Sequence, residues 1–171
     1  MRLWGAVVSF PSTPASLGIV LLVEALFNPS GFSLGGGAAD PKKISGRLQR
    51  YLQAHGYQGA IYPVNPMRDE VQGLPAFKRI ADIDGPCDQA FIMVPSDHVP
   101  EAIRDCAAIG VKGATIYSDG FAETGADGPA KQAAHIRLAR EGSVRILGRN
   151  RLGGIGPASH LTLAVNGGLE M

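Results

Sequence analysis

The feature that most constrains the fold is an alternation, from about residue 24 onward, of short apolar runs with longer amphipathic stretches. The apolar runs have the length of buried strands, and the stretches between them carry apolar residues at helical spacing. This alternation predicts an α/β fold built around a doubly wound, mostly parallel sheet with helices on both faces. The five expected strands cover residues 32–34, 59–62, 89–94, 113–117 and 144–147.

Length and composition suit one globular domain, since the chain has 171 residues, of which 45% are hydrophobic and 18% charged. We expect this domain to span residues 24–171. Residues 1–23 are apolar, but Pro11 and Pro14 interrupt them and no small-residue cleavage site follows. We interpret them as an N-terminal extension, either poorly ordered or the result of a misplaced start. The longest apolar run is too short for a membrane span.

Charge and cysteine content exclude several classes of function. A net charge of +1, without a cluster of Lys and Arg, argues against nucleic-acid binding. The two cysteines, Cys87 and Cys106, lack the spacing of metal ligands and are expected to be reduced. We therefore expect a cytoplasmic protein with no metal, no nucleic-acid partner and no membrane partner.

A glycine-rich turn, Gly35 to Asp40, follows the first expected strand. Asp40 is predicted to cap the next helix, with Pro41 at its first position. Glycines let the backbone approach a phosphate, and Lys42 and Lys43 add positive charge at the helix start. Such a turn is typical of a phosphate site, but it also occurs where only a tight turn is needed.

The pattern fits an NAD site poorly. Gly35 and Gly37 match the first two glycines of Gly-x-Gly-x-x-Gly, but Asp40 occupies the third position. The second strand is followed by Asn65 rather than by an acid that would hold a ribose diol. A phosphorylated ribose, as in coenzyme A (CoA), is easier to place beside Lys42, Lys43 and Asn65. NAD remains the minority interpretation.

No catalytic constellation is evident in the sequence. The four histidines lack metal-ligand spacing, and His98 is interpreted as a solvated loop residue. Asp119 and Glu123 flank the loop after the fourth strand, where capping of the loop is a simpler role than acid–base catalysis. The residues alone indicate a binding domain with no chemistry of its own.

Several segments occur together in a specific order. They are Leu26-Phe-Asn-Pro29, Ala39-Asp-Pro41, Gly59-x-Ile-Tyr-Pro-Val-Asn-Pro66, Glu70-Val-x-Gly-Leu-Pro75, Val94-Pro95, Gly120-Phe-Ala-Glu-Thr-Gly125 and Gly148-x-Asn150-x-Leu-Gly153. The chain, over residues 24–157, resembles the N-terminal, Rossmann-like CoA-binding domain of NDP-forming acyl-CoA synthetases, relatives of the succinyl-CoA ligase α subunit.

The resemblance implies that CoA lies across the ends of the strands. Its phosphates would face Gly36, Gly37, Ala38, Lys42 and Lys43. The nucleotide part would lie against Val64, Asn65 and Pro66, and the next wall would be Val94, Pro95 and Ser96. Gly120, Phe121 and Glu123 would lie near the pantetheine arm, and Asn150 near the thiol.

The chain departs from the family pattern in one motif, and it does not show the motif of another family domain. Where the family has Gly-Pro-Asn-Cys-Leu-Gly, this chain has Arg149 and Arg151, which predicts weakened or altered CoA binding. In the family, the phosphorylated histidine lies in the domain that follows the CoA-binding domain, and the ATP-grasp domain is separate again. The residues around His160 do not match those around the phosphorylated histidine. We expect the CoA-binding part of an ADP- or NDP-forming, acetate–CoA-type ligase, incomplete alone and needing the remaining domains or subunit. The alternatives are a stand-alone CoA-binding regulatory module and a decayed relative.

Overall fold

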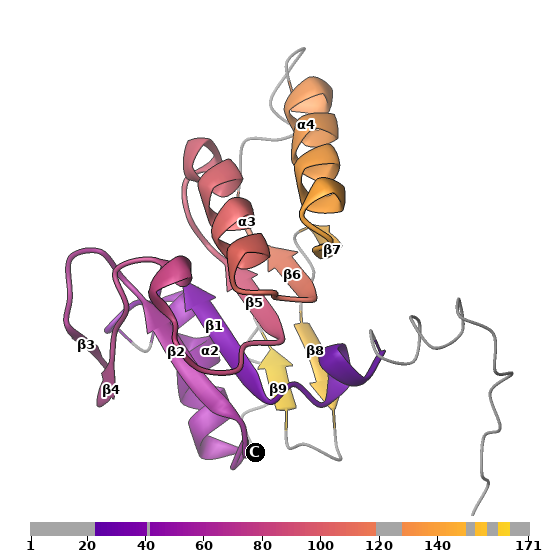
Figure 1. Ribbon diagram of the computed structural model, residues 1–171. Coiled ribbons are helices and arrows are strands. Elements are labelled where there is room, and N and C mark those ends of the chain that lie inside the picture. The colour runs from indigo at the N-terminus through magenta and orange to yellow at the C-terminus, as the bar shows by residue number, and fades with distance from the viewer. Residues whose placement is uncertain (1–22, 41, 119–127, 150–152, 157–160, 165–171) are drawn as a thin grey trace, which may run out of the picture.

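The computed structural model describes residues 23–40, 42–118, 128–149, 153–156 and 161–164 (Figure 1). Its centre is a parallel sheet with the strand order β2-β1-β5-β6-β7. The strands are β1 (Gly31–Gly35), β2 (Ala60–Val64), β5 (Gln89–Ile92), β6 (Gly113–Ile116) and β7 (Arg145–Arg149). The predicted doubly wound sheet is confirmed, because the order reverses between β1 and β5. Loops diverge at such a switch point and leave a crevice for a ligand.

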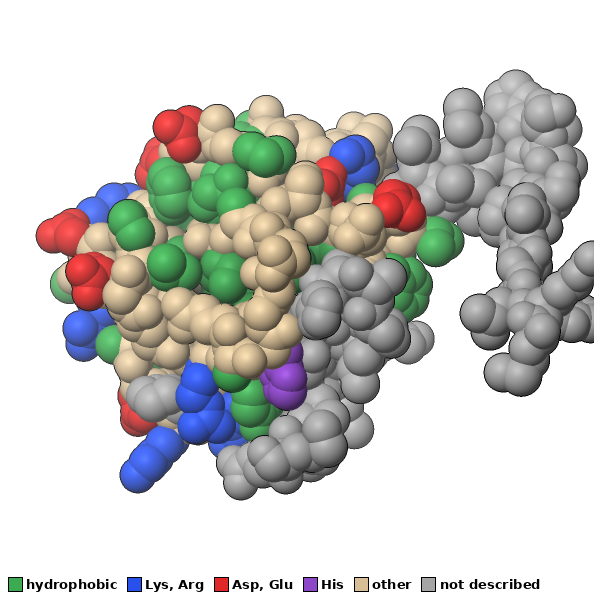
Figure 2. Space-filling model, turned by 90° about the horizontal axis from the view of Figure 1, so that it is seen from below, with side chains coloured by type: hydrophobic (Ala, Val, Ile, Leu, Met, Phe, Trp, Pro, Cys, Tyr) green, Lys and Arg blue, Asp and Glu red, His purple; other side chains and the backbone are tan. Residues whose placement is uncertain are grey.

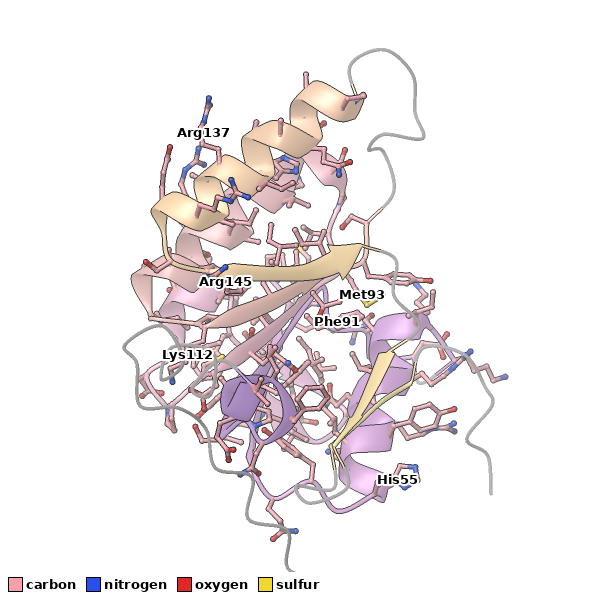
Figure 3. All side chains as sticks on the ribbon, turned by 90° about the vertical axis from the view of Figure 1, so that its right-hand side faces the viewer. His55, Phe91, Met93, Lys112, Arg137 and Arg145 are labelled. Atoms are coloured by element: carbon pink, nitrogen blue, oxygen red, sulfur yellow. The ribbon has the colours of Figure 1, made fainter. Side chains whose placement is uncertain are left out.

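Helices cover both faces of the sheet (Figure 3). One face carries α2 (Ile44–Ala54), and the other carries α3 (Val99–Ala108) and α4 (Gly128–Glu141). A hairpin of β8 (Gly153–Gly156) and β9 (Leu161–Ala164) lies on the α2 side, where β9 contacts α2. None of the described helices is long and apolar enough to cross a membrane.

Shorter elements surround β5 and follow β2. The hairpin of β3 (Glu70–Val71) and β4 (Leu74–Pro75) comes after β2. The 3-10 helix η1 (Ile80–Asp82) precedes β5, and η2 (Ser96–His98) follows it. Residues 23–27 are helical, whereas the rest of the expected N-terminal extension, residues 1–22, lies outside the described residues. Neither hairpin was anticipated from the sequence.

Two apolar clusters hold the layers together. Successive strand residues point to opposite faces, so Ala90 and Ile92 of β5 pack towards α3, whereas Phe91 packs towards α2. On the first face they meet Ile103 and Cys106. On the second, Phe91 joins a cluster completed by Phe32, Leu34, Leu48, Leu52 and Tyr57. Buried apolar area of this kind is the main source of stability, and it fixes the strand ends where the ligand crevice lies.

The predicted start of the first helix is wrong. Helix α2 begins at Ile44 with Lys43 at its N-cap, not with Asp40. Oδ1 of Asp40 accepts a hydrogen bond from the amide of Lys42, 2.9 Å away, and its carbonyl oxygen accepts one from Lys43. A side chain bonded two residues ahead forms an Asx turn, and this turn delays the helix.

Figure 2 views the molecule from below, near the amino ends of the strands. Hydrophobic side chains lie in the middle of this surface, and acidic and basic side chains are mixed along its margin. Neither sign of charge covers the face, in agreement with the net charge of +1.

Candidate functional site

Two adjoining hollows lie beyond the carboxyl ends of β1, β2 and β5, and both include Gly36. The larger, here called the apolar cleft, has a volume of about 500 Å³. It runs between the strand ends, η1 and α3 and is lined by Val64, Pro66, Ile80, Met93, Val94 and Pro95, among others. The smaller, here called the glycine-loop pocket, has a volume of about 330 Å³. It is lined by Gly36, Gly37, Ala38, Ala39, Asp40, Lys43, Ser45, Asn65 and Arg68.

Gly36 occupies a position that only glycine fits. Its φ is +82°, and a Cβ placed on it would lie 2.0 Å from the carbonyl oxygen of Met93. The amides of Gly36 and Gly37 both donate to the carbonyl oxygen of Val64, each over 3.1 Å. These two amides therefore join the loop to β2 and are not free for a phosphate.

The donors that face a ligand come later in the loop. Within the described part of the chain, the amides of Ala38, Ala39 and Asp40 donate no hydrogen bond. They line the glycine-loop pocket with Lys43. Successive free amides beside a cation form a typical anion site.

Asn65 joins the loop after β2 to the glycine loop. Its Nδ2 donates to the carbonyl oxygen of Gly37 over 2.8 Å, and its Oδ1 accepts from the amide of Met67 over 2.9 Å. Both ends of the side-chain amide are thus engaged within the protein. Asn65 lines the pocket, as expected, but its side chain positions the two loops around the ligand.

Two cations line the glycine-loop pocket, Lys43 and Arg68. Arg68 was not anticipated, although it lies only two residues beyond Pro66 in the same strand-end loop. Lys42 was expected to contribute, but it does not line the pocket. Its backbone is held by Asp40 and by Nη2 of Arg47, which donates to the carbonyl oxygen of Lys42 over 3.1 Å.

An ion-pair cluster forms one wall of the apolar cleft. The guanidinium of Arg79 contacts both carboxylate oxygens of Asp105, at 2.7 and 3.3 Å, and Glu101 at 3.0 Å. Hydrogen bonding to Asp105 raises the pKa of Arg79 further above its usual value. Because Nε and Nη2 of Arg79 already bind acids, these two groups are not available to a phosphate. The cluster instead fastens η1 to α3 and so sets the width of the cleft.

The structure brings most of the predicted residues together. Gly36, Gly37, Ala38, Lys43, Val64, Asn65, Pro66, Val94 and Pro95 line the two hollows. Ser96 does not line them, and its carbonyl oxygen accepts from Val99 at the start of α3. His98 is exposed, as expected of a solvated residue, and it also lines the apolar cleft, where it could touch a ligand. Gly120, Phe121, Glu123, Asn150 and Arg151 lie outside the described residues.

The described residues hold no group suited to catalysis. They contain no cluster of three or more His, Cys, Asp or Glu side chains that could hold a metal ion. Both cysteines are buried and free. Burial raises the pKa of Cys87 to about 11 and raises the pKa of Cys106 as well. A thiol that stays protonated is a poor nucleophile.

The chain is similar in sequence to several curated proteins, among them ADP-forming acetate–CoA ligases. The α subunit of acetate–CoA ligase II from Pyrococcus furiosus is 37% identical over 133 residues, which are 77% of this chain and 29% of that protein. Acetate–CoA ligase II from Archaeoglobus fulgidus is 36% identical over 128 residues, which are 75% of this chain and 19% of that protein. The chain thus matches less than a third of the length of these relatives.

Solved structures agree with the sequence comparison. Acetyl-coenzyme A synthetase 1 from Ca. Korarchaeum cryptofilum, in its apo form, superposes with a TM-score of 0.79 and 35% identity, over 84% of this chain and 31% of that one. The sequence pattern of the family described as "CoA binding domain" matches residues 32–156. The predicted resemblance is confirmed, and this chain belongs to the CoA-binding domain family.

Proposed function

We propose that this chain is the CoA-binding part of an ADP-forming acyl-CoA ligase and depends on the remaining ligase domains for chemistry. The observation that carries the proposal is the pair of hollows that share Gly36 at the switch point of the sheet. One hollow is cationic and rich in free amides, whereas the other is apolar. CoA has the same division, with phosphates beside an adenosine and an uncharged pantetheine arm.

The phosphates of CoA are assigned to the glycine-loop pocket. The free amides of Ala38, Ala39 and Asp40 and the cations of Lys43 and Arg68 supply hydrogen bonds and positive charge there. The adenosine is assigned to the apolar cleft, where Val64 and Pro66 form one wall. A mostly apolar hollow with a few polar groups at its rim is the usual form of a nucleotide site.

Ligation itself requires groups that the described residues do not supply. Joining a carboxylic acid to a thiol needs an activated carboxyl group, and in the ligases that the sequence resembles this activation depends on the phosphohistidine and ATP-grasp domains. The matched relatives are more than three times longer than the matched segment, which leaves ample chain for these parts. A decayed relative with weakened CoA binding is the second candidate. Arg149 and Arg151, at positions where the family pattern has proline and cysteine, favour it.

Isothermal titration calorimetry with CoA, dephospho-CoA and NAD tests the proposal. Lys43→Ala and Arg68→Ala should each weaken CoA binding about tenfold, the value of one charge-assisted hydrogen bond. Lys42→Ala is the matched control, because it removes the same charge one residue away and should change affinity less than about twofold. Equal losses at Lys42 and Lys43, or a preference for NAD, would contradict the assignment.

An Arg151→Cys variant separates the two candidates. If the chain belongs to a working ligase, the native protein should already bind CoA, and adding the remaining domains of a relative should yield acyl-CoA. If only the variant binds CoA, the native sequence no longer takes part in ligation. Failure of both to bind would overturn the proposed function.

A further inference from the structure

The two edges of the central sheet differ in how they are protected. At the β2 edge, the segment after β4 covers the strand. The amide of Phe77 donates to the carbonyl oxygen of Pro63, and the amide of Asn65 donates to that of Phe77, each over 2.9 Å. Pro63 itself has no N–H to offer. At the β7 edge, no strand among the described residues pairs with the outer side.

The backbone of β7 presents hydrogen-bonding groups outward. The amide of Arg145 donates to the carbonyl oxygen of Lys112 over 2.9 Å, so Arg145 faces β6. Peptide groups of successive residues in a strand point to opposite sides. The N–H and C=O of Ile146 therefore point away from the sheet, where an added strand can bind them.

A groove beside this edge completes a docking surface, here called the β7 groove. Helix α4 lies alongside β7, and Arg145 stands near the start of the strand (Figure 3). Between them is a groove of about 380 Å³. Ile136 and Ala139 of α4, with Val144 and Ile146, give it an apolar floor, and Arg140 and Arg145 line it as well.

The charge of the groove is positive and unpaired. Among the described residues, neither Arg140 nor Arg145 forms an ion pair. None of the described residues that line the groove is acidic. Glu141 lies next in sequence, but it pairs with Arg137 at 3.8 Å. An apolar floor between two arginines is complementary to a segment that alternates apolar and acidic side chains.

We infer that the β7 groove binds an extended acidic segment of a partner protein, which adds to the sheet as a sixth strand beside β7. Addition of a strand to an open edge is a common mode of peptide recognition, because the backbone supplies affinity and the side chains supply specificity. A second copy of this chain is a poor occupant. Pairing β7 with itself would bring the grooves of both copies, each with Arg140 and Arg145, to one edge, and like charges that face each other destabilise a strand pair.

Fluorescence anisotropy with labelled peptides of about ten residues, the length of one long strand, tests the inference. The probe alternates glutamate and valine, and its matched control alternates lysine and valine. A third peptide has the acidic sequence with its central amides N-methylated, which removes donors needed for strand pairing. The acidic peptide should bind about tenfold more tightly than either of the other two.

Variants of the full chain assign the binding to the groove. The double variant Arg140→Glu/Arg145→Glu should bind the acidic peptide about tenfold more weakly than the wild type does, and it should bind the lysine peptide more tightly. Arg104→Glu makes the same kind of charge change on the exposed side of α3, outside the groove, and should keep the wild-type preference. Retained CoA binding and an unchanged melting temperature show that the double variant is folded.

Several results would overturn the inference. Equal affinity for the acidic peptide and its N-methylated form would mean that charge alone attracts the peptide, without strand addition. If Arg104→Glu weakened binding of the acidic peptide as much as the double variant does, the peptide would not bind in the β7 groove. Absence of peptide binding, or a dimer in sedimentation equilibrium that Arg145→Glu dissociates, would show that no acidic partner strand occupies this edge.

Discussion

Nδ2 of Asn65 donates a hydrogen bond to the carbonyl oxygen of Gly37, 2.8 Å away, and so ties the loop after β2 to the loop after β1. The same side chain accepts from the amide of Met67 over 2.9 Å. Asn65 thus holds two loops that line one pocket, and Arg68 follows three residues later in the second of them. If the proposed assignment of the CoA phosphates to this pocket is correct, the side chain at position 65 should therefore strongly affect CoA binding.

Asn65→Asp should weaken CoA binding more than Asn65→Ala. Alanine removes the bond to Gly37 and should cost about tenfold in affinity. Aspartate is nearly isosteric, yet it cannot donate to Gly37 and it places a negative charge beside the bound phosphates, so a further loss of several-fold is expected. Calorimetry with CoA measures both changes.

A control for this comparison is Asn28→Asp, which alters an amide outside both hollows that donates to Glu24 over 2.7 Å. This variant should bind CoA as the wild type does. If Asn65→Asp also kept full affinity, the phosphates would not lie in the glycine-loop pocket.

Gly36→Ala should destabilise the fold far more than Gly73→Ala. Both glycines have positive φ, +82° and +80°, so alanine costs about 1 kcal/mol at either position. Only Gly36 has a neighbour in the way, since its added Cβ would lie 2.0 Å from the carbonyl oxygen of Met93, whereas nothing lies within 4 Å at Gly73. The clash should add about 2 kcal/mol.

Urea denaturation gives the free energy of unfolding for the wild type and both variants. The difference between the two variants isolates the contact with Met93, because the backbone conformation is shared. Similar losses at the two positions would show that the β1 and β5 loops do not approach as closely as the structure indicates.

The strand pattern was predictable because a buried parallel strand is a local signal. Each expected strand was found, with ends shifted by one or two residues. The start of α2 was not predictable from the local sequence. An aspartate such as Asp40 is equally suited to cap a helix and to form an Asx turn before it, and the loop geometry decides between the two. Contacts with residues distant in the sequence therefore determine where this helix begins.

The candidate site was only partly predictable for the same reason. Gly36 and Gly37 line the glycine-loop pocket, but their amides were expected to face a phosphate and instead bond to Val64, which becomes their neighbour only through the pairing of β1 with β2. Nothing in the local sequence marked Arg68 as a pocket residue, because it lies in a loop with other polar residues. The Arg79–Asp105 ion pair joins residues 26 positions apart in the chain, so the local sequence around either residue does not predict it.

Arg79→Ala should cost much more stability than Lys78→Ala, although the two cations are adjacent. Arg79 pairs with Asp105, and although the side chain of Arg79 is 53% exposed, that of Asp105 is only 9% exposed, so removing Arg79 leaves a buried carboxylate without its cation. Lys78 pairs with Asp69, whose side chain is 95% exposed, and such a surface pair is worth less than about 1 kcal/mol. Urea denaturation of both variants measures the difference.

The double variant Arg79→Ala/Asp105→Ala serves as a check on the mechanism. Removing both partners should recover part of the stability that Arg79→Ala loses, because no unpaired carboxylate remains. If the double variant were less stable by the sum of the single losses, the two residues would act independently and would not form a clamp between η1 and α3.

Asp88 should make the stability of the protein fall at acid pH. Burial pushes its pKa upward, but hydrogen bonds from Lys112, over 2.5 Å, and from the amide and hydroxyl of Ser30 hold the pKa of Asp88 below its usual value. A carboxyl with a lowered pKa in the folded state stabilises the protein above the unfolded-state value of about 3.9. That contribution is lost as the pH falls through the lower, folded-state pKa.

Comparison of the wild type with Asp88→Asn isolates this contribution from the other carboxylates. Urea denaturation at neutral pH should show the variant to be less stable. The difference in stability should narrow as the pH drops below about 4, where Asp88 of the unfolded wild type becomes protonated, and should vanish once the pH falls through the lower folded-state pKa. Asp84→Asn, which changes an exposed carboxyl nearby, should follow the wild-type profile. A gap between wild type and Asp88→Asn that stayed constant across this range would mean that Asp88 is protonated alike in the folded and unfolded chain, and that its bonds to Lys112 and Ser30 do not stabilise the charge.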